Sequence, residues 1–180
     1  EKIIDIGCAT GSFLSHLSKE MPQAELFGAD VRDDLLAKAK EICPKSVFFK
    51  LDIQDNLSFE NLDFSENYFD VCIMDGVHTI FDEVDIWVKN LTKLTREKGK
   101  IYVFGSFNSR DFDVITRVKS TNSNEWEKGW NRISIKSVIN EFEKYNYQAK
   151  IERFDINIDI EEDVNDPRRN WTMFANGSRI

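Results

Sequence analysis

The sequence has little cysteine, proline or histidine, with three, three and two residues of these types among 180. Cys8, Cys43 and Cys72 show no C-x-x-C spacing, so we expect buried thiols in a reducing compartment and no disulfide framework. No apolar run approaches the length that crosses a membrane, and no secretory signal is visible. These absences predict a cytoplasmic protein with no membrane partner.

The sequence also has fewer basic than acidic residues, so the formal net charge is −8 and the isoelectric point is about 4.9. Basic patches supply non-specific affinity for phosphate backbones, so this composition argues against a nucleic-acid partner. Four arginines could still form a local basic spot, namely Arg153, Arg168, Arg169 and Arg179. The length suits a single domain over residues 1–180, and no repeat, linker or low-complexity tract interrupts it.

The first residues carry the most informative pattern. The β-branched run Ile3–Ile6 fits a buried parallel strand. A loop of small residues, Gly7–Gly11, follows, and Phe13, Leu14 and Leu17 then repeat at helical spacing. A strand, a small-residue loop and a helix in this order are typical of nucleotide-cofactor sites in open α/β sheets. The alternative is a tight turn that needs no ligand.

The spacing of the small residues indicates which cofactor. A dinucleotide fingerprint would require Gly or Ala at position 12, where Ser12 stands. The chain instead has Asp5-x-Gly7-x-Ala9-x-Gly11, which resembles motif I of the class I S-adenosylmethionine-dependent methyltransferases; Ala9 stands where that family usually has glycine. Members of that family usually carry helices before this motif, so we expect lid helices upstream of Glu1 that are missing here.

This resemblance implies S-adenosylmethionine as cofactor and a binding site spread over several strand ends. Asp30, nineteen residues after Gly11, would bind the ribose hydroxyls, unless it is a solvated strand-end acid or a helix cap. Asp52 would accept from the adenine amino group and the Ile53 N–H would meet the ring, unless Asp52 is an ordinary loop acid. The complete expected set is Asp5, Gly7, Cys8, Ala9, Gly11, Asp30, Val31, Asp52, Ile53 and Asp75.

The remaining periodicity alternates between strand and helix, which predicts a right-handed parallel sheet. We expect further strands at 24–30, 46–51, 69–74 and 100–104, and helices at 33–42, 80–94 and 134–145. The segments 151–160 and 170–176 read as an antiparallel pair at the sheet edge. The predicted fold is therefore α/β, a Rossmann-like, doubly wound, mostly parallel seven-stranded sheet with an antiparallel edge hairpin, as in the methyltransferase family.

Catalysis would need little besides alignment, because a sulfonium methyl group is already activated. A base is needed only for a hydroxyl or protonated amine acceptor, and the candidates are His78, Asp75, Ser106 and Asn108. We select His78, oriented by Asp75, and expect a pKa near the ordinary ~6.5. The alternative for His78 is a residue without catalytic consequence. A magnesium site of the catechol type would use Asp75 and Asn108, but no acid precedes Asn108, so no metal is expected.

The connection 105–132 mixes aromatic and polar residues after the fifth strand, at the edge where ligands bind. Its aromatic residues would be loop anchors or pocket walls. We expect Phe107, Trp126 and Trp130 to form an apolar acceptor wall, with Asn108 and Asn131 as polar contacts.

The predicted activity is methyl transfer from S-adenosylmethionine to an O or N atom of a small-molecule acceptor, and S-adenosylhomocysteine is the product. Two alternatives remain. One is a nicotinamide oxidoreductase on a similar sheet, and the other is a non-catalytic cofactor-binding protein that retains the fold. The oligomeric state does not follow from the sequence.

Overall fold

The structure is a computed structural model that describes residues 1–55, 66–122, 124–153, 174–175 and 178–179. The chain divides into two compact units, Glu1–Ala149 and Lys150–Ile180. All residues predicted to form the site lie in the first unit. That the whole chain is one domain stays a prediction. No helix in the described ranges is long and apolar enough to cross a membrane.

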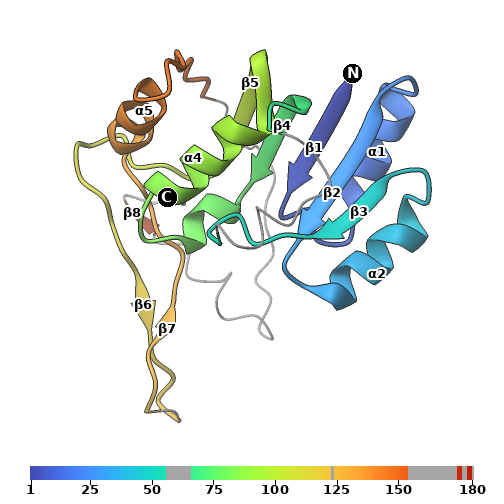
Figure 1. Cartoon of the computed structure of the whole chain (residues 1–180). Helices are drawn as coiled ribbons and strands as arrows, with labels where there is room; N and C mark the ends of the chain where they lie inside the picture. The colour runs from blue at the N-terminus through green and yellow to red at the C-terminus, as the bar shows by residue number, and fades with distance from the viewer. Residues whose placement is uncertain (56–65, 123, 154–173, 176–177, 180) are drawn as a thin grey trace. The chain divides into compact units, whose positions relative to one another are not determined.

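The first unit is built on a five-stranded parallel sheet in the order β3-β2-β1-β4-β5. The strands are β1 Lys2–Ile6, β2 Glu25–Asp30, β3 Val47–Lys50, β4 Phe69–Asp75 and β5 Thr95–Phe104. Their carboxyl ends share one edge of the sheet (Figure 1). The strand order reverses between β1 and β4, which is where open α/β sheets bind ligands.

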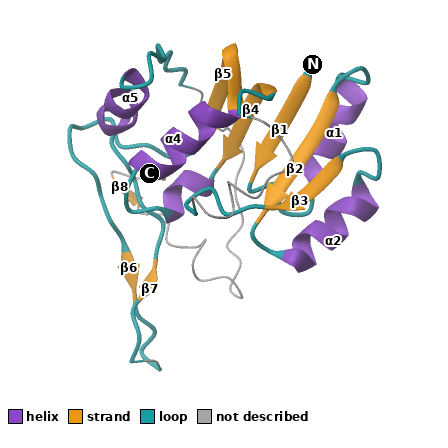
Figure 2. Ribbon diagram, in the orientation of Figure 1, coloured by secondary structure: helices purple, strands orange, loops and turns teal. Residues whose placement is uncertain are grey.

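Helices pack against both faces of the sheet, as the two separate apolar cores show (Figure 2). The helices are α1 Ser12–Glu20, α2 Asp33–Ile42, α4 Asp85–Leu94 and α5 Ile135–Glu143, and the 3-10 helix η1 spans Val77–Ile80. Alternate residues of one strand face opposite ways. In β1, Ile4 belongs to the core with Trp87 of α4, whereas Ile3 belongs to the core with Leu14 of α1.

This arrangement confirms a Rossmann-like parallel sheet with helices wound on both sides. The seven-strand count is not confirmed. Of the expected edge hairpin, residues 154–173 lie outside the described residues. Among the described residues, β8 Phe174–Ala175 is antiparallel to β9 Ser178–Arg179, and the predicted pairing of 151–160 with 170–176 stays a prediction. The three cysteines are buried and unpaired, as predicted.

Two local predictions in the second half of the sheet need correction. The helix expected at 80–94 is broken, because η1 ends at Ile80, the chain is extended at Phe81, and α4 begins only at Asp85. The fifth strand begins at Thr95, directly after α4, and its pairing with β4 shifts register between Phe69 and Val71. The apolar residues do repeat at helical spacing, but this spacing does not show that the helical backbone is interrupted between Ile80 and Asp85.

The connection after β5 contains an element that the sequence did not suggest. Strands β6 Arg117–Val118 and β7 Glu127–Lys128 form an antiparallel hairpin, extended by the bridge between Val114 and Arg132. Figure 1 shows this hairpin extending away from the sheet on the side of the strands' carboxyl ends. The acceptor region predicted from residues 105–132 is therefore largely a two-stranded arm.

Candidate functional site

The loop between β1 and α1 contains three residues with a left-handed backbone conformation, and one of them is not glycine. Gly7, Ala9 and Gly11 all have positive φ, at 77°, 47° and 73°. Glycine adopts this region freely, whereas alanine rarely does. The loop is tied to β2, because the Gly7 and Cys8 N–H groups both donate to the Ala29 carbonyl at 2.7 and 3.0 Å. Three left-handed residues in five thus turn the chain sharply at the carboxyl end of β1.

Asp30, the last residue of β2, holds this loop in place. Its Oδ2 accepts the Ala9 N–H at 2.9 Å and its Oδ1 accepts the Arg32 N–H at 3.0 Å. The residue is 8% exposed. Each carboxylate oxygen has a second lone pair, so these bonds leave acceptor capacity for hydroxyl groups.

Asp5 lies almost completely buried at the carboxyl end of β1. It is 3% exposed, and its Oδ1 has no hydrogen-bond partner among the described residues. Burial and, to a smaller extent, the negative charges of Asp75 and Asp30 together raise the pKa of Asp5 to about 7. Partial removal from water also raises the pKa of Asp75, although its side chain is exposed on one side. Three carboxyl groups therefore lie close enough to interact at the strand order's reversal point, and a cationic ligand would relieve their repulsion.

The turn after β3 supplies the other predicted cofactor residues. Asp52 Oδ1 accepts the Gln54 N–H at 2.9 Å, and the Asp55 N–H donates to the Asp52 carbonyl at 3.0 Å. Asp52 is exposed and Ile53 is buried. The Leu51 N–H donates to the Asp30 carbonyl at 3.1 Å, so this turn is joined directly to the end of β2.

The cofactor-binding residues expected from the sequence thus lie at one sheet edge. Asp5, Asp30 and Asp75 are at the carboxyl ends of β1, β2 and β4, and the others are on the connections after β1, β2 and β3. Within this group Ala9 and Val31 are exposed, whereas Cys8 is buried and burial raises the pKa of its thiol to about 12. Their contact with a cofactor stays a prediction. In the described ranges, no group of three or more His, Cys, Asp or Glu side chains could hold a metal ion.

His78, the predicted base, is in the interior. It lies in η1 with no exposed surface, and its ring stacks on Phe107 with centroids 4.3 Å apart. Its Nε2 is 3.4 Å from the Ser106 carbonyl oxygen, and its Nδ1 has no partner in the described part of the chain. Burial lowers the pKa of His78 to about 4. The expected pKa near 6.5 is therefore wrong, because the ring is removed from water. The catalytic role stays a prediction.

Asn131, expected as an acceptor contact, joins the hairpin to the segment after η1. It has no exposed surface, and its Nδ2 donates to the Phe81 carbonyl and to Asp82 at 2.9 and 3.0 Å. Its Oδ1 accepts the Thr116 N–H at 2.8 Å. Asp82 also pairs with Arg117 at 2.7 Å. The geometry gives Asn131 a clear structural role, whereas its predicted contact with an acceptor is untested.

The other predicted acceptor residues lie on two different segments. Phe107 is half-buried against His78, and Asn108 closes a local turn, with Nδ2 donating to the Phe112 carbonyl at 2.6 Å. Trp126 and Trp130 belong to the hairpin and are 67% and 39% exposed. The Lys119 ammonium lies 6.0 Å from the centre of the Trp126 ring. A common apolar wall made of these side chains stays a prediction.

Val77 was not identified from the sequence, and its side chain packs so closely against Gly7 that only glycine fits there. A Cβ atom added at Gly7 would lie 2.1 Å from Val77 Cγ2, in addition to the strain of its positive φ. The loop after β1 and the start of η1 are therefore in close contact. No local pattern could have revealed this, because the two residues are seventy positions apart.

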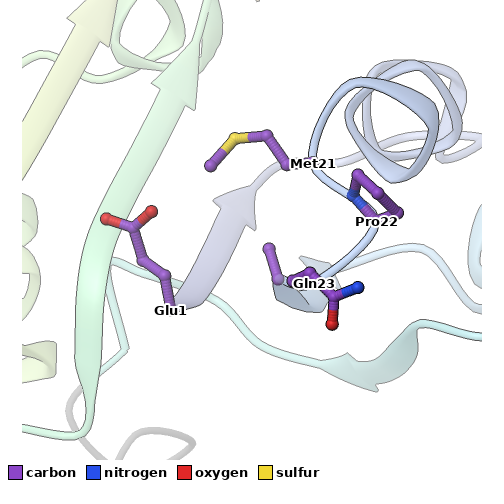
Figure 3. Close-up of a pocket in the computed structure, with 5 residues that line it drawn as sticks. Glu1, Met21, Pro22 and Gln23 are labelled. Carbon is purple, nitrogen blue, oxygen red and sulfur yellow. The ribbon is translucent and has the colours of Figure 1, made fainter.

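A shallow pocket of about 240 Å³ lies elsewhere, lined by Glu1, Met21, Pro22, Gln23 and Ala24. Figure 3 shows these side chains at the start of β1 and in the turn between α1 and β2. This is the amino end of the strands, opposite the carboxyl groups described above. Its lining carries one titratable side chain and no converging polar groups, so it does not compete as the candidate site.

Comparisons of the sequence with known proteins show the family of the chain. A family model described as a methyltransferase domain matches residues 1–149. An uncharacterized methyltransferase of Schizosaccharomyces pombe is 32% identical over 101 residues, which are 53% of this chain and 35% of that protein. The chain thus spans about a third of the length of that relative.

Comparisons of the structure show the fold. An S-adenosylmethionine-dependent methyltransferase from Mesorhizobium loti matches 79% of this chain and 72% of its own, with a TM-score of 0.56 and 13% identity. The [4+2]-cyclase SpnF matches 79% of this chain and 50% of its own, with a TM-score of 0.57 and 14% identity. At these identities the likeness establishes the architecture alone.

The raised pKa of Asp5 predicts how stability changes with pH. Because the folded chain retains this proton up to about pH 7 and the unfolded chain releases it near pH 4, Asp5 destabilises the fold progressively as the pH rises through that interval. We expect Asp5→Asn to raise the free energy of unfolding at pH 8 by about 1–3 kcal/mol, with a much smaller gain near pH 4.

Urea unfolding at both pH values measures this difference. Asp75→Asn is the matched control, because Asp75 is exposed and its gain should be smaller. A gain from Asp5→Asn that is equal at pH 4 and pH 8 would mean that the Asp5 carboxyl does not titrate in this range.

Proposed function

Because the chain belongs to the class I S-adenosylmethionine-dependent methyltransferases, we propose that it transfers the methyl group of S-adenosylmethionine to an O or N atom of a small-molecule acceptor. S-adenosylmethionine is the cofactor of this family. The acceptor class is our inference from the acidic composition and the absence of a basic stripe in the sequence. The transfer occurs at the carboxyl edge of the sheet.

The observation that carries this proposal is the joint geometry of the Gly7–Gly11 loop and Asp30. The loop is turned by its left-handed residues, and its amides are held by the end of β2. Asp30 keeps acceptor capacity for two vicinal hydroxyl groups, as a ribose requires. Because Asp30 also holds the turns after β1 and β2, the same carboxylate would both position the loop and accept the hydroxyl groups.

The charges near the loop fit this cofactor. Asp5, with its unpaired buried oxygen, and Asp75 would face the positively charged methionyl portion, and the turn at Asp52 would face the adenine. When bound, S-adenosylmethionine supplies a methyl group that is already activated by its sulfonium sulfur. The residues of the chain therefore bind and orient the two reactants. Cation binding would also release the proton that burial leaves on Asp5.

Proton removal is assigned to His78, which follows β4. At neutral pH its low pKa keeps the imidazole uncharged, which is the form that can accept a proton. Because the Gly105–Phe107 segment covers the ring, the acceptor can reach it only if this segment moves. A carboxylate, thiolate or neutral amine acceptor would need no base, and His78 would then be a packing residue.

Cofactor binding provides the first test. We expect S-adenosylhomocysteine to raise the melting temperature and NAD to leave it unchanged. Asp30→Ala should weaken S-adenosylhomocysteine binding about ten- to a hundredfold in calorimetry, because losing a charged hydrogen-bond partner costs about 1.5–3 kcal/mol.

The matched control for this variant is Asp33→Ala, since Asp33 is an exposed acid near the same strand end that pairs with Lys50. It should keep the wild-type affinity. Unchanged affinity in Asp30→Ala would remove Asp30 from the site, and stabilisation by NAD alone would favour an oxidoreductase.

His78 makes a separate prediction for turnover. With an acceptor found by screening small molecules, His78→Ala should slow S-adenosylhomocysteine formation by at least about a hundredfold, while cofactor affinity stays the same. The wild-type rate should rise with pH through about 4 and stay level near pH 6.5. His16→Ala, which alters the exposed histidine of α1, is the control. Full activity of His78→Ala would instead indicate an acceptor that reacts without a base.

A further inference from the structure

Asn90 is a fully buried polar residue on the apolar side of α4. It stands three residues after Trp87 and four before Leu94, and all three have at most 2% of their surface exposed. Residues at this spacing share one face of a helix. A hydrophobic residue would be expected at such a position, so the asparagine requires a reason.

The two polar atoms of the Asn90 side chain have different surroundings. Nδ2 donates to the Ile53 carbonyl at 2.7 Å, across 37 residues of sequence. Oδ1 is buried and has no hydrogen-bond partner among the described residues. A buried unpaired acceptor is destabilising. Asparagine is therefore not the residue that would stabilise this core best, and its distinctive feature is the bond to Ile53.

Ile53 belongs to the turn that the proposed function assigns to adenine. On one side this turn is attached to β2 through the bond from the Leu51 N–H to the Asp30 carbonyl. On the other side the Ile53 side chain is buried and its carbonyl is held by Asn90. The Ile53 carbonyl shares its planar peptide unit with the Gln54 N–H, which donates to Asp52 Oδ1 at 2.9 Å. The bond from α4 therefore holds the peptide unit that orients the Asp52 carboxylate, and this unit is joined at the Ile53 Cα to the peptide that carries the Ile53 N–H.

We infer that Asn90 is a positioning residue for adenine recognition. By holding the peptide between Ile53 and Gln54, whose N–H donates to Asp52 Oδ1, it keeps the Asp52 carboxylate, and the Ile53 N–H of the preceding peptide, directed at the edge of the adenine ring. This inference rests on the proposed function, because it requires the adenosyl portion at this turn. Asn90 itself touches neither cofactor nor acceptor.

Replacing Asn90 should affect adenine recognition much more than it affects the stability of the fold. In Asn90→Leu, a side chain of similar size removes the unpaired Oδ1 atom but leaves the Ile53 carbonyl without its donor. One unpaired buried acceptor replaces another, so the melting temperature should change little. The turn, however, loses its attachment to α4, and the discrimination between purine edges should weaken.

Binding of S-adenosylhomocysteine and S-inosylhomocysteine measures this discrimination by calorimetry. The inosyl analogue carries a carbonyl in place of the amino group and a proton on the adjacent ring nitrogen, so it reverses the pattern that Asp52 and the Ile53 N–H recognise. The wild-type chain should prefer the adenosyl compound at least about tenfold. Asn90→Leu should lower that ratio at least about fivefold.

The matched control is Thr95→Val, which removes another buried side-chain bond at the end of α4, from Thr95 Oγ1 to the Leu91 carbonyl at 2.7 Å. It should keep the wild-type ratio even if the melting temperature falls. A wild-type ratio in Asn90→Leu, or an equal drop in both variants, would overturn the inference while leaving the proposed function intact. A wild-type chain that does not bind S-adenosylhomocysteine contradicts the proposed function itself. One that binds both compounds equally would overturn only the assignment of adenine to this turn and the role of Asn90 with it.

Discussion

The Asp30 carboxylate is the interaction on which the candidate site depends. Its two oxygens accept the N–H groups of Ala9 and Arg32, so one side chain connects the turn after β1 with the turn after β2. The carbonyls of Ala29 and Asp30 accept three further amides, those of Gly7, Cys8 and Leu51. The carboxyl end of β2 thereby fixes both neighbouring connections, and the left-handed conformation of Ala9 persists because its amide is bonded there.

This arrangement has an electrostatic cost. Asp30 and Asp75 both raise the pKa of the buried Asp5, and burial raises it most. A chain selected for stability alone would not keep three interacting carboxyl groups at one strand end. The same groups favour a cationic ligand, because its positive charge reduces the repulsion between the carboxylates and thereby strengthens binding. Asn90 shows the same conflict on a smaller scale, because its unpaired oxygen accompanies the bond that orients Ile53.

The sequence predicts those features whose signal is local. The β-branched run at Ile3–Ile6 and the spacing from Asp5 to Gly11 identify the central strand and its loop, and both are observed. The break at Phe81 was missed because apolar periodicity continues through it. The hairpin and the buried amide of Asn131 were missed because their contacts join distant segments. Burial of His78 under Phe107 likewise depends on packing between η1 and the segment that follows β5, which no single segment encodes.

The central claim is that S-adenosylmethionine binds at the carboxyl edge of the sheet, over the loop after β1. Amide chemical shifts of the ¹⁵N-labelled chain during titration with S-adenosylhomocysteine test this directly. The account predicts the largest changes at Gly7–Gly11, Val31 and Ile53, with little change at Met21–Ala24 on the opposite edge. Changes concentrated at Met21–Ala24, or no changes at saturating ligand, would contradict it.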